Sequence, residues 1–310
     1  MTSFDYLSRD GTQIRGWHND ADGPAVLISN GLGTNPQAWP AIIDPTSGFR
    51  VATWYYRGTG GSLRPADPTH IRIEDHADDA IALLDQLGIE KALVCCWSLG
   101  VNIGFELAER HPDRVAGLLA VAGVPGGTFS AMLGPLRVPH AWRHTIGMAG
   151  ARLLGACGPW IDTVFRVVPI NRATARVISH TGFMLPSAKP EVLVAALEEF
   201  RRHDFRWYFG LAVAAGDHLP MDLEFVRCPT TLVAGRYDVI TSLRAMVDAA
   251  QQIPHARLVI VPGSHFLPLE RPDEMLELLR DLDVETAAVA ARPPPLRRGA
   301  RRPAARGSGR

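Results

Sequence analysis

Short apolar runs alternate with helical segments over much of this chain, and that alternation limits the folds it can adopt. Between several runs the apolar residues recur every three or four positions, which is the period of an amphipathic helix. Parallel strands need helical crossovers, so the pattern predicts an α/β fold whose sheet has helices on both faces. The expected strands are 4–8, 13–18, 25–29, 49–56, 91–96, 117–123, 230–235 and 256–263, and the expected helices are 74–88, 99–111, 242–252 and a last one from 272.

The alternation stops in the middle of the chain. From about residue 124 to 226 the sequence is helix-like and interrupted by prolines, and strand patterns then return. The simplest organisation is one α/β domain, made of residues 1–123 and 227–286, with a helical cap inserted at 124–226. Residues 287–310 form an Arg- and Pro-rich tail without an apolar period, for which we expect disorder.

Composition excludes several classes of function. The 310 residues carry 32 basic and 32 acidic side chains, so no net charge steers the chain to nucleic acid. No apolar run reaches the roughly 18 residues of a membrane span, and the N-terminus lacks a secretory signal pattern, so a cytoplasmic protein is expected. The cysteines form no C-x-x-C pair, and metal-binding and phosphate-loop motifs are absent, so no cofactor or metal is expected. The helix at 74–88 has a polar face for which solvation is expected, comprising Asp75, His76, Asp78 and Asp79.

The stretch CWSLG at 96–100 joins the end of an apolar run to the start of a helix. A serine at such a turn presents its hydroxyl at the strand end, and the usual frame is G-x-S-x-G because strand and helix pass closely. Ser98 is therefore the candidate nucleophile. Cys96 occupies the first glycine position, and we interpret it as a compact filler, because a thiol buried at a strand end lacks the exposure and lowered pKa of a nucleophile.

Two further strand ends carry the base and the acid that a serine nucleophile needs. Asp238 follows the run at 230–235, and His265 follows the run at 256–263. The carboxyl ends of parallel strands lie at one edge of a sheet, so Ser98, Asp238 and His265 are expected to meet there. Each residue alone is weak, but their matched positions predict a Ser-His-Asp triad.

With these segments, and with NGLGTN at 30–35 and YYRGTGGS at 55–62, the chain resembles the α/β-hydrolase superfamily over about residues 4–285. The first of the two loops is most similar to that of the enol-lactonase and cofactor-free haloperoxidase-like branches. The resemblance implies a mostly parallel eight-stranded sheet and a cap over the strand ends. It also implies an oxyanion hole formed by the backbone N–H groups of Leu32 and Leu99.

Two further residues depart from the family pattern. Asn30 stands where a histidine is commoner, and Tyr55 stands where an aspartate is usual. We expect these changes to alter how the two loops are anchored, because the backbone donors of an oxyanion hole do not depend on them.

The expected activity is hydrolysis of a carboxylic ester or lactone of a small-to-medium apolar substrate through an acyl-enzyme. The same triad also serves C–C bond hydrolases, acyltransferases and cofactor-free haloperoxidase-type enzymes, and a non-catalytic binding protein of this fold is an alternative of another class. The partner is then a small molecule, with neither nucleic acid nor a membrane span, and the oligomeric state stays open, a homodimer included. An apolar pocket under the cap is expected to be lined by Trp39, Trp97, Phe129 and Trp142.

Overall fold

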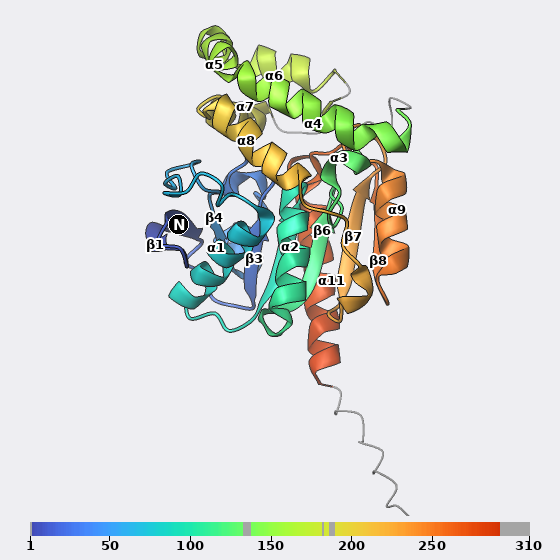
Figure 1. Cartoon of the computed structure of the whole chain (residues 1–310). Coiled ribbons are helices and arrows are strands. Elements are labelled where there is room, and N and C mark those ends of the chain that lie inside the picture. The colour runs from blue at the N-terminus through green and yellow to red at the C-terminus, as the bar shows by residue number, and fades with distance from the viewer. Residues whose placement is uncertain (1, 133–137, 182, 186–189, 292–310) are drawn as a thin grey trace, which may run out of the picture.

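The computed structural model describes residues 2–132, 138–181, 183–185 and 190–291. An eight-stranded sheet lies at the centre of the fold (Figure 1). The strands are β1 (Thr2–Leu7), β2 (Gln13–His18), β3 (Ala25–Ser29), β4 (Arg50–Trp54), β5 (Ala92–Trp97), β6 (Val115–Val121), β7 (Thr230–Gly235) and β8 (Arg257–Val261). Their spatial order is β1-β2-β4-β3-β5-β6-β7-β8. β2 pairs antiparallel with β1 and β4, and the other neighbours pair in parallel. The predicted mostly parallel eight-stranded sheet is confirmed.

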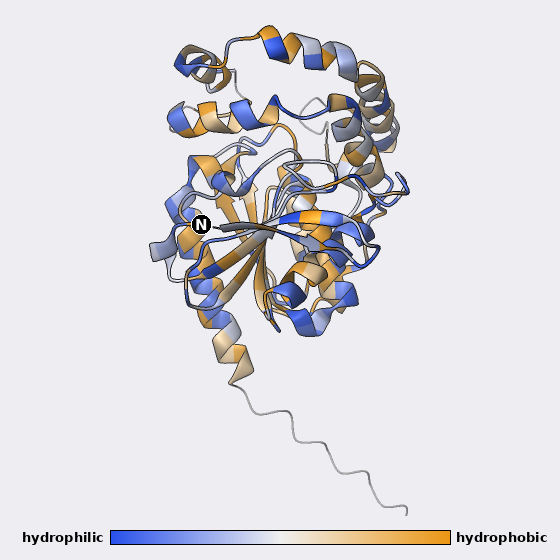
Figure 2. Cartoon of the chain, turned by 90° about the vertical axis from the view of Figure 1, so that its left-hand side faces the viewer, coloured by the Kyte–Doolittle hydropathy of each residue, from blue (hydrophilic) through white to orange (hydrophobic). Residues whose placement is uncertain are grey.

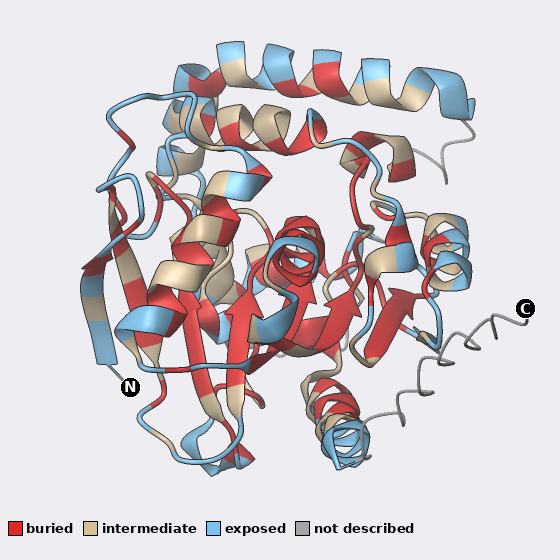
Figure 3. Ribbon diagram, turned by 60° about the horizontal axis from the view of Figure 1, so that its bottom comes forward, coloured by how far each residue is buried: buried red, intermediate tan, exposed pale blue. Residues whose placement is uncertain are grey.

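Two apolar clusters, one on each face of the sheet, form the core. The helices that cover the sheet are α1 (Ile73–Gln86), α2 (Leu99–Arg110), α9 (Leu243–Gln252), the short α10 (Leu267–Glu270) and α11 (Pro272–Ala290). α1, α2 and α9 bury their apolar sides in one cluster, and α11 does so in the other. Side chains alternate along a strand, so Cys96 of β5 lies in the first cluster and Cys95 in the second. Hydrophobic residues gather in the central strands in Figure 2, and Figure 3 shows these strands buried, whereas β1 at the edge is mostly exposed.

The described part of residues 124–226 forms a helical layer, the cap, over the carboxyl ends of the parallel strands (Figure 1). Its helices are α3 (Thr128–Ala131), α4 (His140–Ala156), α5 (Gly158–Val167), α6 (Arg172–Ile178), α7 (Pro190–Phe200) and α8 (Phe205–Gly216). α8 lies between the core and α4, and it contacts both α4 and α5. Loops at the strand ends and the cap therefore face each other.

The last helix is longer than the sequence analysis predicted. α11 continues to Ala290, so the proposed tail does not begin at residue 287. The segment that precedes Pro293 contains alanines and no proline, and nothing in it ends a helix. Residues 292–310, the rest of the predicted tail, lie outside the described residues. Within the described ranges no helix is long and apolar enough to cross a membrane.

Candidate active site

Ser98 lies at the turn between β5 and α2, in a backbone conformation that few side chains adopt. Its φ is 55° and its ψ is −119°, and conformations of this kind cost about 1–3 kcal/mol. The N–H of Ser98 donates to the carbonyl of Val121 at 2.9 Å, which ties the turn to β6. A Cβ at Gly100 would lie 2.1 Å from the carbonyl oxygen of Ser29, so only glycine fits there. The turn thus presents the serine hydroxyl while the helix passes close to the sheet.

Cys96 occupies the space above a glycine of the facing helix. Its side chain is fully buried, and a Cβ at Gly104 of α2 would lie 2.2 Å from its Sγ. The close passage of strand and helix is therefore kept by a glycine on the helix in place of one on the strand. Burial raises the pKa of the Cys96 thiol well above its usual value, which keeps it protonated and a poor nucleophile.

The imidazole of His265 connects Ser98 to Asp238. Its Nε2 lies 2.8 Å from Ser98 Oγ, and its Nδ1 lies 2.9 Å from Asp238 Oδ2. An ionised carboxylate only accepts hydrogen bonds, so Nδ1 carries the proton and Nε2 accepts from the serine hydroxyl. Asp238 Oδ1 accepts from the N–H groups of Ile240 at 2.7 Å and Thr241 at 2.8 Å, which fixes the carboxylate. The structure brings the three predicted residues together.

Trp97 and Glu270 hold the loop that carries His265. The indole N–H of Trp97 donates to the carbonyl of His265 at 2.8 Å. The buried carboxylate of Glu270 accepts from the N–H of Ser264 at 2.8 Å and from its hydroxyl at 2.6 Å. It also accepts from the N–H of Leu185 in the cap at 2.8 Å. Sequence reasoning missed Glu270, although an acid within the apolar stretch after His265 is the signal of a buried, hydrogen-bonded carboxylate.

The two residues predicted to form the oxyanion hole lie in the wall of the cavity that contains Ser98. Leu99 is the first residue of α2, where an N–H has no carbonyl partner within the helix. Leu32 lies in the loop at 30–35 after β3, here called the oxyanion loop, and both leucines line the same cavity as Ser98. The carbonyl of Gly31 accepts from the N–H of Thr34 at 3.2 Å and from its hydroxyl at 2.8 Å, which holds the loop in shape.

Asn30 anchors the oxyanion loop from below. Its Nδ2 donates to Thr53 Oγ1 at 2.9 Å, its Oδ1 accepts from the indole N–H of Trp39 at 3.1 Å, and its carbonyl accepts from the hydroxyl of Tyr56. Trp39 is 1% exposed, and the described cavity lining does not include it. Its assignment to the pocket was therefore wrong, because its indole is used to hold Asn30.

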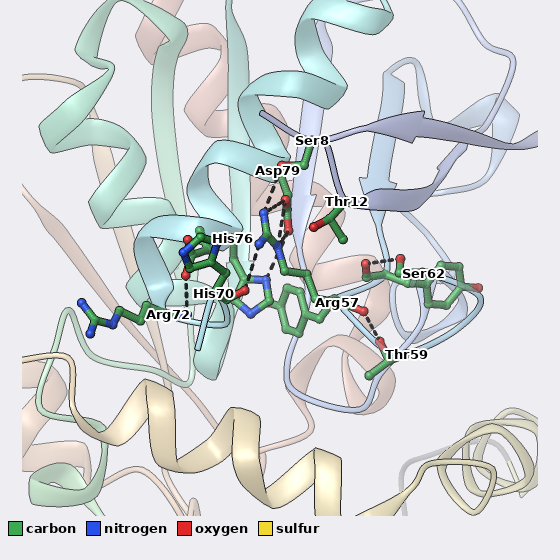
Figure 4. Close-up of polar contacts among 12 residues, drawn as sticks. Ser8, Thr12, Arg57, Thr59, Ser62, His70, Arg72, His76 and Asp79 are labelled. Carbon is green, nitrogen blue, oxygen red and sulfur yellow. Dashed lines mark hydrogen bonds and ion pairs between the residues drawn. The ribbon is translucent and has the colours of Figure 1, made fainter. Parts of the chain in front are cut away.

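Arg57 anchors the loop after β4, where Tyr55 replaces the usual aspartate. Its guanidinium is 1% exposed and lies 2.7 Å from Asp79 (Figure 4). It also lies 2.6 Å from Asp10. Burial alone lowers the pKa of Arg57, but the hydrogen bonds and charges of the two aspartates outweigh it and raise that pKa. Burial raises the pKa of Asp79, and His76 and Arg57 together outweigh it and lower that pKa. The prediction that the polar face of the helix at 74–88 is solvated was therefore wrong for His76 and Asp79, which are 2% and 0% exposed.

A cavity of about 810 Å³ lies between the cap and the strand ends, with Ser98 and His265 in its wall. Its described lining contains no Asp, Glu, Lys or Arg, and Trp97 and Phe129 belong to it. The other apolar and aromatic contributors include Met132, Leu193, Leu197, Phe200, Tyr208 and Phe266.

Trp142 lies elsewhere, contrary to the sequence expectation. It is 63% exposed and is not in the described lining of the cavity. Ala151, one of the buried residues of α4, follows nine residues later, about two and a half helical turns, and therefore lies on the opposite face of the helix. Trp142 therefore points to solvent. Its apolar character alone could not show whether it faces the cavity or the solvent.

Comparison with known proteins agrees with this architecture. Residues 24–272 match the family model described as alpha/beta hydrolase fold. The chain is 28% identical over 271 residues to a Caulobacter sp. (strain K31) protein whose provisional name is carbamate hydrolase RutD, covering 83% of this chain and 91% of the relative. It is 29% identical over 273 residues to the pimeloyl-[acyl-carrier protein] methyl ester esterase of Aromatoleum aromaticum, covering 84% of this chain and 98% of the relative. The enol-lactonase of Burkholderia xenovorans LB400 has a similar structure, with a TM-score of 0.69 at 22% identity, over 91% of this chain and all of the other.

Proposed function

Because this chain is an enzyme of the α/β hydrolase fold family, we propose that it is a serine hydrolase that cleaves carboxylic esters of uncharged, apolar acyl groups. The observation that carries the proposal is the hydrogen-bonded chain from Ser98 Oγ through His265 to Asp238, with distances of 2.8 Å and 2.9 Å. It lies in the wall of a cavity whose described lining contains no Asp, Glu, Lys or Arg. The names of the relatives, a methyl ester esterase and a carbamate hydrolase, both describe cleavage at an acyl carbon bonded to a heteroatom.

In the first half of the reaction Ser98 Oγ attacks the ester carbonyl carbon while His265 Nε2 takes the hydroxyl proton. Asp238 holds the Nδ1–H tautomer and stabilises the imidazolium that forms. The tetrahedral oxyanion accepts hydrogen bonds from the N–H groups of Leu32 and Leu99, and each such donor contributes about 10²–10³ in rate. The C–O bond then breaks, the imidazolium gives its proton to the leaving alcohol, and an acyl-enzyme remains.

The second half returns the enzyme to its starting state. His265 Nε2 takes a proton from a water molecule, whose oxygen attacks the acyl carbon of the ester on Ser98. The same two N–H groups receive the second oxyanion. When it collapses, the proton on His265 returns to Ser98 Oγ and the carboxylic acid leaves. No other group is needed to balance protons and electrons.

The lining of the cavity determines which acyl groups are favoured. A charged acyl group would lose its hydration there without finding an opposite charge among the described lining residues, which is costly. Each methylene that moves from water into the cavity contributes about 0.8 kcal/mol. Three added carbons therefore raise kcat/KM by roughly 10- to 50-fold until the cavity is filled.

A panel of p-nitrophenyl esters from acetyl to decanoyl, with hemisuccinate as the charged member and Ser98→Ala as the control, tests the proposal. The expected result is a rise in kcat/KM from acetyl to a medium-chain acyl group and a low value for the hemisuccinate. A flat profile across chain length, or a preference for the charged ester, would contradict the assignment of an uncharged apolar substrate. Simple lactones measured alongside show whether ring esters enter the same site.

A further inference from the structure

The cap packs closely against Gly33 of the oxyanion loop. Gly33 has a φ of +75°, and a Cβ added to it would lie 2.6 Å from Tyr208 Cε2, 3.0 Å from Phe200 Cε2 and 3.2 Å from His203 Nε2. Three cap side chains thus leave no room for even a methyl group on this residue. Phe200 and Tyr208 also line the cavity, so the same side chains face both the substrate and the loop.

His203, in the connection between α7 and α8, also makes a hydrogen bond to this loop. Its Nε2 lies 3.0 Å from the carbonyl oxygen of Gly33. A carbonyl only accepts, so Nε2 carries a hydrogen and donates it. Both the Nε2–H tautomer of a neutral imidazole and the imidazolium provide this donor.

Two planar peptide groups connect this hydrogen bond to the N–H of Leu32. The carbonyl of Gly33 and the N–H of Thr34 belong to one peptide group, so holding the oxygen orients the N–H in the opposite direction. That N–H donates to the carbonyl of Gly31 at 3.2 Å, and the Thr34 hydroxyl donates to the same oxygen at 2.8 Å. The carbonyl of Gly31 in turn shares its peptide group with the N–H of Leu32. Successive hydrogen bonds of this kind also polarise one another.

We propose that His203 is a positioning residue, which orients the Leu32 N–H toward the reacting oxygen through its hydrogen bond to Gly33 and the two peptide groups that follow. This role rests on the proposed function, in which Leu32 is an oxyanion donor. The geometry of the oxyanion loop then depends on the cap, because the His203–Gly33 hydrogen bond is the one bond of this series whose donor lies in the cap.

The cap has other attachments to the core close by. The indole N–H of Trp207 donates to the carbonyl of Arg57 at 2.8 Å, and Arg64 pairs with Asp204 at 2.6 Å. These contacts do not touch the oxyanion loop. Removal of the His203 donor is therefore expected to loosen the loop while the cap stays in place.

Three variants separate the donor from the bulk of the side chain. His203→Gln keeps an N–H donor as many bonds from Cα as Nε2, His203→Asn keeps one only at the place of Nδ1, and His203→Ala keeps none. Trp207→Phe is the matched control, because it removes a neighbouring hydrogen bond from the cap to a core carbonyl. Each variant is measured for kcat and KM on the best ester of the panel, and for the inhibition constant of an alkyl boronic acid, which forms a tetrahedral adduct with a serine.

With Asn or Ala at position 203 we expect kcat to fall about five- to tenfold, the loss of roughly one hydrogen bond, with KM within about twofold. The inhibition constant of the boronic acid should rise by about the same factor. The Gln variant and the Trp207→Phe control should both retain kcat within about twofold of the unmodified enzyme. Equal kcat in all variants, or a Gln variant as slow as the Ala variant, would overturn the role of the donor.

Hydrogen exchange of the peptide that contains residues 30–35 provides a readout that does not require hydrolysis. Exchange should be about tenfold faster in the Asn and Ala variants and unchanged in the Gln variant, since a loop that loses its hydrogen bond to the cap opens more often. Unchanged exchange in all of them would refute the connection between His203 and the loop. If exchange responds as expected but the unmodified enzyme cleaves no ester, the positioning contact stands and the proposed substrate class fails.

Discussion

The contact between Cys96 and Gly104 can be tested by adding one methyl group to helix α2. In Gly104→Ala the new Cβ would lie 2.2 Å from Cys96 Sγ, whereas its next neighbours, Cys96 Cβ at 3.5 Å and Leu118 Cδ2 at 3.6 Å, are at ordinary contact distance. The sulfur atom is therefore the only obstacle at this position among the three nearest atoms. Cys96→Ala removes that atom and keeps the Cβ.

The size of the effect follows from two opposing contributions. An extra methyl group forced into a packed core costs about 1–3 kcal/mol, and alanine in place of glycine inside a helix contributes about 1 kcal/mol. With Cys96 present we expect Gly104→Ala to lower the free energy of unfolding by about 2 kcal/mol, because the overlap is severe. In the Cys96→Ala background the same change should raise it by about 1 kcal/mol, which gives a coupling energy of roughly 3 kcal/mol.

Urea unfolding of the four proteins of this cycle measures the coupling energy directly. Ester hydrolysis measured in parallel should show that Cys96→Ala retains activity, since the buried thiol takes no part in the reaction. A coupling energy below about 0.5 kcal/mol would refute the argument that the glycine on the helix replaces the usual glycine of the strand. Loss of activity in a folded Cys96→Ala protein would contradict the interpretation of Cys96 as a filler.

Two further predictions concern stability and the end of the chain. Asp79→Asn leaves the buried Arg57 with one ionic partner fewer and should lower the free energy of unfolding by about 3–5 kcal/mol in urea titrations at pH 7; a loss below about 1 kcal/mol would contradict a buried ion pair. In the folded state the pKa of Asp79 is lowered and that of Asp10 is lowered to about 2. The contribution of these ionised carboxylates to the free energy of unfolding is therefore complete above about pH 4 and is lost as the pH falls toward 2. Urea midpoints measured from pH 5 to 2 should decline less steeply in Asp79→Asn than in the unmodified enzyme. Truncation after Ala291 should leave turnover of a soluble ester unchanged, because every residue placed at the site lies before it, and a large drop in a folded truncate would contradict this.

The sequence predicted correctly those features that depend on local patterns of residues. The strand and helix periods located the sheet, and the positions of Ser98, Asp238 and His265 after strands located the centre of the site. It did not predict the features that depend on how helices pack against the core. Whether a tryptophan of the cap turns inward depends on which helix face meets the core, so Trp142 was misplaced.

Long-range hydrogen bonds were the other class that sequence patterns could not predict. The burial of Asp79 depends on Arg57, which lies 22 positions earlier, and local charge patterns show no such pairing. His203 and Gly33 are 170 positions apart and meet only because the cap folds back over the strand ends. An isolated histidine next to an aspartate in a helical insertion has no local pattern that would single it out.

The most direct test of the central claim is labelling with a fluorophosphonate, followed by mass spectrometry of the labelled peptide. The account predicts that one probe adds to the native enzyme at Ser98, that prior heat denaturation prevents labelling, and that Ser98→Ala takes up no probe and retains less than about a thousandth of the turnover while staying folded. Labelling at another residue, or a folded Ser98→Ala protein that still hydrolyses esters at a comparable rate, would contradict it.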